Sequence, residues 1–227
     1  MTADTSVIQD DSNPNFREEL KQQRWDDHRY YHHSRINQSL HLFSATCFLL
    51  TYALIFIKPS VAGLFGWLVA MCSRQIGHFF FEPKCYDEVN RATHEHKEEI
   101  KIGYNLFRKR VLHSIWGLLP VFLYLHPSMF GLVSPHANWA DYFYNLSILW
   151  LALGVGALLF RTVHLFFIYN VQTGLVWMTK ILTDPFHDFK QYLKSPLYLL
   201  KGELIDPMLH VQHNMIGVEE EPEGLAT

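Results

Sequence analysis

The chain has 227 residues, 49% of them hydrophobic and 15% aromatic, and its formal net charge is −3. This length suits one domain, and a near-neutral charge without a basic patch argues against nucleic acid as a partner. Three cysteines without metal-like spacing predict neither a disulfide framework nor a thiol site. The unusual feature of the composition is its 14 histidines.

Four apolar stretches follow a polar N-terminal segment, residues 1–38, which has no signal-peptide pattern and which we expect to be cytosolic. Each stretch approaches the roughly 20 residues that a helix needs to cross a bilayer. The four stretches are residues 40–57, 61–81, 111–133 and 143–169. The first two are separated by a short turn that contains Pro59, a residue that stops helices.

Lysine and arginine alternate between the segments that connect these stretches. The N-terminal segment has five and residues 83–110 have seven, whereas the turn 126–142 has none. Because cytosolic segments are enriched in these residues, both termini and the loop 82–110 are predicted to be cytosolic. We therefore predict an all-α polytopic membrane protein in which residues 39–169 form four transmembrane helices, arranged as two hairpins. A soluble helical bundle is the alternative, and four apolar stretches of this length argue against it.

The tail, residues 170–227, mixes lysines with aromatic and aliphatic residues and is predicted to form amphipathic helices. Such helices either lie flat in the headgroup region or pack across the cytosolic mouth of the bundle.

Each apolar stretch has one histidine near its predicted cytosolic end: His41, His78, His113 and His164. If these side chains face inward they converge on one point, as in metal-binding helix bundles. Arg74, His78 and Glu82 are spaced four residues apart and share one helical face. Ionisable groups within a span usually face a bundle interior or an aqueous cavity. The alternative is that each of them simply reaches the membrane interface.

A second polar face precedes the first stretch, where His33, Asn37 and His41 are also four residues apart. The helical rise places His33 roughly 12 Å from His41, too far for one ion unless the helix bends or begins between them. Spacing alone therefore leaves the ligand set open. His94 and His96 lie in a highly charged loop, where a solvated segment is the default and metal ligation the alternative.

Two motifs in this region resemble the fungal 2-hydroxy fatty acid dioxygenases, small membrane proteins of the endoplasmic reticulum with bacterial relatives. The first is Y-H-H-x-x-x-N-x-x-x-H at residues 31–41, and the second is G-H-x-x-x-E at residues 77–82. The resemblance covers residues 28–83, about a quarter of the chain. It implies an Fe(II)-dependent enzyme of phytosphingosine breakdown that relies on histidines and shortens a 2-hydroxy fatty acid by one carbon (α-oxidation).

Matched by position, the resemblance also implies the site residues. The implied ligands are His33, His41 and His78, and the further candidate ligands are His32, His94, His96, His113 and His164. Asn37 and Glu82 accompany them, and Glu82 either orients a ligand histidine or binds iron itself. Arg74 departs from the family, which has glutamine there, and we expect its guanidinium to bind the substrate carboxylate.

The sequence thus predicts an integral membrane oxidoreductase that cleaves C1 from C2 of a 2-hydroxy fatty acid with Fe(II) and O₂. We expect it in the endoplasmic reticulum of a eukaryote or the inner membrane of a bacterium, among membrane lipids and with its site facing the cytosol. The sequence is also compatible with a homo-oligomer. One alternative is a di-iron lipid hydroxylase or desaturase, because His28, His32 and His33, with His210 and His213, echo its histidine boxes. Another is a non-catalytic lipid-binding or scaffold protein.

Overall fold

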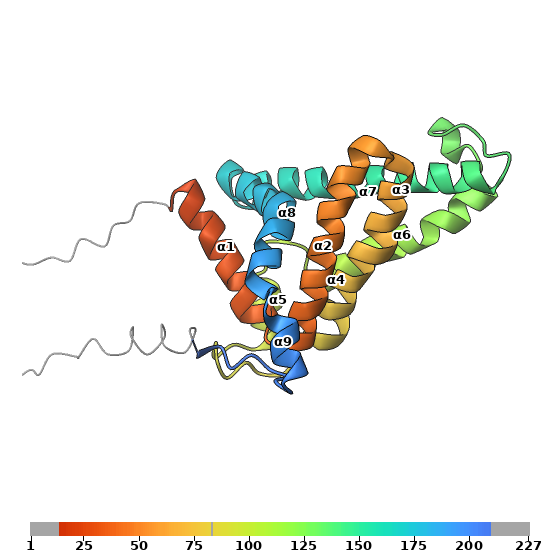
Figure 1. The fold of residues 1–227 in the computed structure, drawn as a ribbon. Helices are drawn as coiled ribbons and strands as arrows, with labels where there is room; N and C mark the ends of the chain where they lie inside the picture. Colours follow the sequence, from red (N-terminus) through yellow and green to blue (C-terminus); the bar gives the residue numbers. More distant parts are fainter. Residues whose placement is uncertain (1–13, 83, 210–227) are drawn as a thin grey trace, which may run out of the picture.

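The computed structural model describes residues 14–82 and 84–209, and most of this part of the chain is helical (Figure 1). The elements are α1 (Phe16–Tyr31), α2 (Arg35–Ile57), α3 (Pro59–Phe65), η1 (Gly66–Met71), α4 (Cys72–Ile76), η2 (Gly77–Phe81), α5 (His94–Glu99), α6 (Leu106–Leu125), η3 (Met129–Gly131), α7 (Trp139–Ile168), α8 (Val171–Tyr192) and α9 (Ser195–Leu200). Within these described ranges there is no β-strand, only two isolated β-bridges. The all-α prediction is confirmed.

Polar side chains determine where the helices begin. The side chain of Asn15 accepts hydrogen bonds from the backbone N–H groups of Arg17 and Glu18, and the Glu18 carboxylate accepts one from the backbone of Asn15. Three later helices begin with the same type of cap, at Asn105 (α6), Asn138 (α7) and Asn170 (α8). These caps satisfy first-turn N–H groups that have no partner within the helix.

Residues 59–81 form one helical run in which α-helical and π-helical segments alternate. Pro59 occupies the first position of α3, where a missing N–H group leaves no hydrogen bond unmade. The π-helical segments are η1 and η2, and π turns inside helices frequently occur at functional sites. η2 contains the histidine of the second sequence motif, His78, directly after Gly77.

Two glycines allow this run to approach its neighbours closely. A Cβ atom on Gly77 would lie 2.2 Å from Oδ1 of Asn37 in α2, so only glycine fits between η2 and α2. A Cβ atom on Gly63 would lie 2.3 Å from the backbone oxygen of Ser147 in α7. The run is therefore held against α2 at its C-terminal end and against α7 near its N-terminal end.

Aromatic residues join η1 to the hairpin of α6 and α7. Trp67 donates a hydrogen bond from its indole N–H to the backbone oxygen of Trp150 and stacks on Trp116 at a ring-centroid distance of 5.4 Å. Leu123 of α6 is buried in the same cluster. This apolar core fixes how the helices pack and contains no charged group.

Among the described residues, two helices are long and apolar enough to cross a membrane, α2 and α7. Each has large apolar side chains on its outer surface: Phe56 is 88% exposed and Phe167 is 83% exposed. Exposed apolar surface marks a site of contact with lipid or protein. In Figure 1, α7 runs across α2 and α3 instead of alongside them. These observations give coarse support for membrane association, and the four-span topology with cytosolic termini stays a prediction.

The C-terminal helices pack against the rest of the protein. α8 packs along α2 and also contacts α1 and α7, and α9 contacts α2 (Figure 1). Val176 and Trp177 are buried on the inner face of α8. Of the two arrangements predicted for the tail, α8 therefore has the one in which it packs against other helices. His210 and His213 lie outside the described residues.

Candidate metal centre

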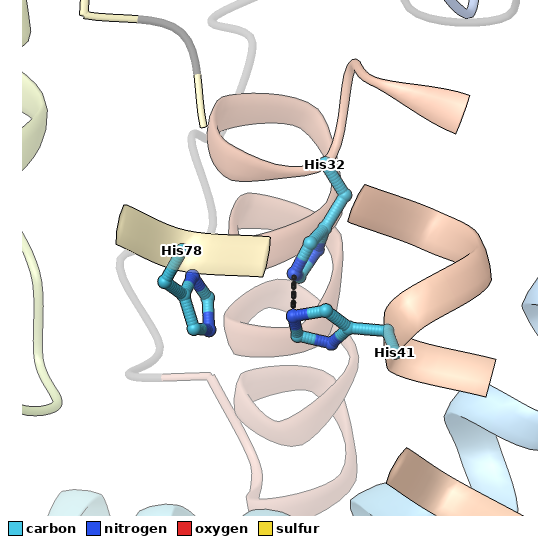
Figure 2. A group of neighbouring side chains, drawn as sticks. All are labelled: His32, His41 and His78. Carbon is cyan, nitrogen blue, oxygen red and sulfur yellow. Dashed lines mark hydrogen bonds between the residues drawn. The ribbon is translucent and has the colours of Figure 1, made fainter. Parts of the chain in front are cut away.

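Three histidines from three separate elements meet at one point (Figure 2). His32 follows the last residue of α1, His41 lies in the second turn of α2, and His78 belongs to η2. One ring nitrogen of each lies within 4.8 Å of the others. Nε2 of His32 and Nε2 of His41 are 3.3 Å apart. This spacing suits three nitrogen ligands of one ion. Among the described residues, no other group of three or more His, Cys, Asp or Glu side chains has suitable geometry for a metal ion.

The connection between α1 and α2 places His32 over His41. α1 ends at Tyr31, the chain turns, and α2 begins at Arg35 with Ser34 as its cap. Side-chain amides of α2 hold this turn: Asn37 donates a hydrogen bond to the backbone oxygen of Tyr31, and Gln38 donates one to that of His32. Because α2 begins between His32 and His41, the rise of a continuous helix does not set the distance between these two histidines.

Carboxylates orient two of the three rings. Nδ1 of His78 lies 2.7 Å from Oε2 of Glu82, and Nδ1 of His41 lies 3.4 Å from Oδ2 of Asp188 in α8. A carboxylate accepts a hydrogen bond from Nδ1–H, which leaves the lone pair of Nε2 for a metal ion. Glu82 therefore lies beside the ligand histidine that the sequence motif paired with it.

The burial of the cluster favours neutral imidazoles. His41 is fully buried and His32 is 4% exposed. Burial, together with repulsion from His41 and Arg74, lowers the pKa of His32 well below its ordinary value. Neutral imidazole is the form that binds metal ions. Nδ1 of His32 is buried without a hydrogen-bond partner, and Nε2 of this ring contacts only Nε2 of His41.

The donor set narrows the class of metal. Three imidazole nitrogens suit iron, zinc, copper or nickel, and three protein ligands leave coordination positions open for small molecules. The residues present thus fit one ion of this group of metals.

His33, the first ligand that the sequence motif implied, is not part of this cluster, and His32 takes its place. Nε2 of His33 lies 3.3 Å from Oδ2 of Asp87 and within hydrogen-bond distance of the backbone oxygen of Arg29. Adjacent residues in a non-helical turn point in different directions, so only one of the two histidines can face His41. The other histidine, His33, contacts Asp87 in the loop between η2 and α5.

Part of this loop is buried against the end of α1, unlike the solvated segment that its charge predicted. Lys97 of α5 is 1% exposed, and its ammonium group lies 3.4 Å from Oδ2 of Asp87. The hydroxyl of Tyr31 donates a hydrogen bond to the backbone oxygen of Lys97. Burial opposes the ionisation of Asp87, but hydrogen bonds from His33 and Asn90 lower its pKa below the ordinary range. The loop therefore clamps the end of α1 next to His32.

The other four candidate ligands lie apart from the cluster. His94 lines a pocket beside His78, and His96 is exposed on α5. Nδ1 of His113 bonds to the backbone oxygen of Lys109, and Nδ1 of His164 lies 2.9 Å from the guanidinium of Arg161. The expected convergence of four histidines, one from each apolar stretch, is thus limited to His41 and His78. His113 instead packs against Phe79 of η2, and His164 against Phe160 of its own helix.

Arg74 is already paired. Its guanidinium donates a hydrogen bond of 2.7 Å to Asp188 and lies 3.8 Å from Asp184. Sequence reasoning missed these two aspartates, together with Tyr192, whose ring centroid lies 5.5 Å from that of His32. A signal was present, because Lys180, Asp184, Asp188 and Tyr192 are each four residues apart and form one polar face on α8.

A pocket on the α8 side of the cluster contains a balanced set of charges. Its three cations and three carboxylates are Arg24, Arg74, Lys180, Asp27, Asp184 and Asp188. Lys180 bonds to Asp27 and lies 3.1 Å from Asp184, which Arg24 also approaches. Burial opposes the ionisation of Asp188, but Arg74 and His41 lower its pKa below the ordinary range. Each charge in this pocket has a partner of opposite sign.

A second pocket lies on the His78 side and is lined also by Glu82, Glu98, His94 and Lys109. Lys101 pairs with both carboxylates, at 3.6 Å from Glu82 and 3.5 Å from Glu98. Burial and repulsion from Lys101 lower the pKa of Lys109 to about 7. Both pockets thus contain cations and carboxylates, one on each side of the histidine cluster.

In comparisons with protein-family models, curated proteins and solved structures, nothing matches this chain.

Proposed function

We propose that this chain is a membrane enzyme in which His32, His41 and His78 bind Fe(II), and that it shortens a 2-hydroxy fatty acid by one carbon with O₂. The observation that supports this most is the buried three-imidazole cluster, with ring nitrogens within 4.8 Å of one another. The cluster lies near the beginning of α2, a helix long and apolar enough to cross a membrane. The reaction class rests on the resemblance of residues 31–41 and 77–82 to the fungal dioxygenases.

The reaction balances without a further reductant. A 2-hydroxy acid, R–CHOH–COOH, and O₂ give R–COOH, CO₂ and H₂O. The bond between C1 and C2 breaks, C2 becomes the new carboxyl carbon, and C1 leaves as CO₂. The four electrons that O₂ accepts all come from these two carbons, so no reductase partner is required. Fe(II), when bound, supplies open coordination positions for oxygen chemistry.

The residues of the chain hold and shield this site. Asp188 and Glu82 accept hydrogen bonds from Nδ1–H of His41 and His78, which keeps both Nε2 atoms directed at one point. Arg74 holds Asp188 in place through its 2.7 Å hydrogen bond. Tyr192 covers the cluster from α8, and its hydroxyl lies 3.2 Å from Nδ1 of His28. Burial of the His32 and His41 rings limits the access of bulk water to the site.

The number of metal ions separates this proposal from the di-iron alternative. Within residues 14–82 and 84–209, one group of metal-binding side chains has suitable geometry, and it favours one ion per chain. His28 and His33 contact Tyr192 and Asp87 instead of a shared centre.

The test is anaerobic loading of the detergent-purified chain with Fe(II), followed by addition of O₂ and 2-hydroxypalmitate. We expect about one iron per chain and, by mass spectrometry, pentadecanoic acid with CO₂. His78→Ala should abolish both iron binding and product. Two irons per chain would favour the hydroxylase alternative. A wild-type protein that binds no transition metal and forms no product would favour a non-catalytic lipid-binding protein.

A further inference from the structure

The two pockets beside the histidine cluster differ in their capacity to bind an anion. In the α8-side pocket, the guanidinium of Arg74 is already bonded to Asp188, which contacts His41, and lies close to Asp184. A substrate carboxylate at Arg74 would compete with the buried Asp188 for this guanidinium. Displacement would leave that aspartate charged, buried and unpaired, which costs several kcal/mol.

Two cations line the His78-side pocket, the exposed Lys84 and the half-buried Lys109. Its carboxylates, Glu82 and Glu98, are both occupied by Lys101, and Glu98 also accepts a hydrogen bond from the backbone N–H of Leu106. Among the described residues, no carboxylate lies within ion-pair distance of the Lys109 ammonium group. Lys109 nevertheless lines the same pocket as His78, one of the three candidate ligands.

A second unused hydrogen-bonding group faces the same pocket. His94 lines it from the first turn of α5, and Nδ1 of His94 is buried without a hydrogen-bond partner. A buried polar atom without a partner is costly unless a ligand or water satisfies it. An ammonium group and an imidazole N–H together match the two oxygens of a carboxylate.

We propose that the carboxylate of the substrate binds in the His78-side pocket, on Lys109 with His94 as a second donor, and that Lys109 rather than Arg74 selects acids over neutral lipids. This inference rests on the proposed function, since it assigns the acid group of the same substrate. Lys109 and His94 are positioning residues, because they hold the end of the substrate next to His78. Arg74 then serves to hold Asp188.

The inference is tested by ligand binding to the full chain loaded with Zn(II), which prevents turnover. Equilibrium dialysis compares 2-hydroxypalmitate with hexadecane-1,2-diol, which has the same chain length and hydroxyl group but no carboxylate. The variants are Lys109→Met, Lys109→Arg and Arg74→Met, with Lys190→Met as control because Lys190 is exposed on α8. Taking the ratio of the two affinities cancels differences in detergent partitioning. Zinc content and thermal melting establish that each variant is folded and loaded.

Lys109→Met should reduce the acid-to-diol preference by about 10-fold or more, the magnitude of a hydrogen bond to a charged group, without loss of zinc. Lys109→Arg should restore much of the preference, and Lys190→Met should leave it unchanged. The inference is overturned if Lys109→Met keeps the wild-type preference, or if Arg74→Met is the variant that loses it.

Failure of this inference is distinct from failure of the proposed function. If the wild-type protein binds iron and forms pentadecanoic acid while Lys109→Met keeps its acid preference, only the assignment of Lys109 fails. If the wild-type protein binds no iron and forms no product, the proposed function fails whatever the preference ratio is.

Discussion

At the scale of single residues, the direction of each imidazole ring is set by what holds its Nδ1 atom. His41 and His78 each have a carboxylate at that position, whereas Nδ1 of His32 is buried without a partner. The orientation of His32 therefore depends on the turn that carries it, held by Asn37 and Gln38. Two rings are fixed by side chains and one by the backbone.

The two adjacent histidines should respond differently to replacement. His32→Ala removes a ligand, so we expect the bound metal to fall below about one tenth of the wild-type content, with little change in stability of the metal-free protein. His33→Ala should retain the metal and lower the free energy of unfolding by about 1–3 kcal/mol, because buried Asp87 loses a partner. Metal analysis and thermal melting measure both. The opposite pattern, with metal lost only from His33→Ala, would restore the ligand set implied by the motif.

Asp188 should tune metal affinity without binding the metal. Asp188→Asn keeps the shape of the side chain but weakens the acceptor for Nδ1 of His41 and the partner of Arg74. We expect metal affinity to fall by about 10- to 100-fold, the usual cost of losing a group that orients a ligand. Chelator competition measures the affinity. Asp141→Asn is the control, because the Asp141 carboxylate bonds only to Ala137 and Asn138 in the turn before α7; an equal loss in both variants would contradict the role of Asp188.

At the scale of elements, the cluster depends on how closely η2 approaches α2. The contact is made at Gly77 and Asn37, one residue before His78 and one turn before His41. The loop after η2 adds a second constraint, because Asn90 donates a hydrogen bond to the backbone oxygen of Arg29 near the end of α1. The three segments that carry the histidines are thus fastened to one another by short contacts.

Filling the space at Gly77 should separate these elements. Gly77→Ala places a Cβ atom 2.2 Å from Oδ1 of Asn37. We therefore expect the free energy of unfolding to fall by about 1–3 kcal/mol and metal binding to weaken. Gly117→Ala in α6 is the control, since a Cβ atom there meets nothing within 4 Å and alanine favours the helix by about 1 kcal/mol. Melting in detergent with and without metal compares them. A Gly77→Ala protein as stable as wild type would contradict the close packing of η2 on α2.

The loop clamp should weaken in acid. Because hydrogen bonds lower the pKa of Asp87 in the folded state below its ordinary value of 3.8, its contribution to stability is present above that value. The contribution is lost as the pH falls through the lower, folded-state pKa. At pH 7 we expect Asp87→Asn to be less stable than wild type by about 1–3 kcal/mol. Melting curves from pH 7 to pH 3 should show the difference shrinking, and a difference that grows in acid would contradict this reading.

At the scale of the whole molecule, polar and apolar surfaces are segregated. Apolar side chains such as Phe56 and Phe167 project from α2 and α7, while the charged residues gather around the histidine cluster between α1, α8 and the loop after η2. A substrate with a long acyl chain and one charged end matches this division, because each end then meets surface of its own kind.

The predicted topology can be tested with single cysteines in sealed membrane vesicles. Cys85 is exposed in the loop between the second and third apolar stretches, and Ser134 is exposed in the turn between the third and fourth. With the other cysteines replaced by alanine, an impermeant maleimide should label Cys85 from the cytosolic face and Ser134→Cys only from the opposite face. Labelling of both from one face would contradict four membrane spans.

The sequence by itself determined the helices and much of the site. Asparagine caps and apolar periodicity are local signals, so the beginnings of α6, α7 and α8 follow from short stretches of chain. His41, His78 and Glu82 could be predicted because their spacing on a helix and their resemblance to a family are also local properties. The contact between Glu82 and His78 is made where η2 ends and the backbone becomes extended, so helical spacing predicted the pair but not its geometry.

Only the tertiary structure decided which neighbouring histidine joins the cluster and what surrounds it. His32 and His33 are adjacent residues of the same type. The backbone of the turn between α1 and α2 directs only the His32 side chain toward His41. Asp188 lies 147 residues from His41 in the chain, so no periodicity connects them. Arg74 was predicted to bind substrate because its charge was visible in the sequence, whereas its pairing with Asp188 arises from the packing of α8. Long-range partners depend on how helices pack, and packing is not encoded in the spacing of any one segment.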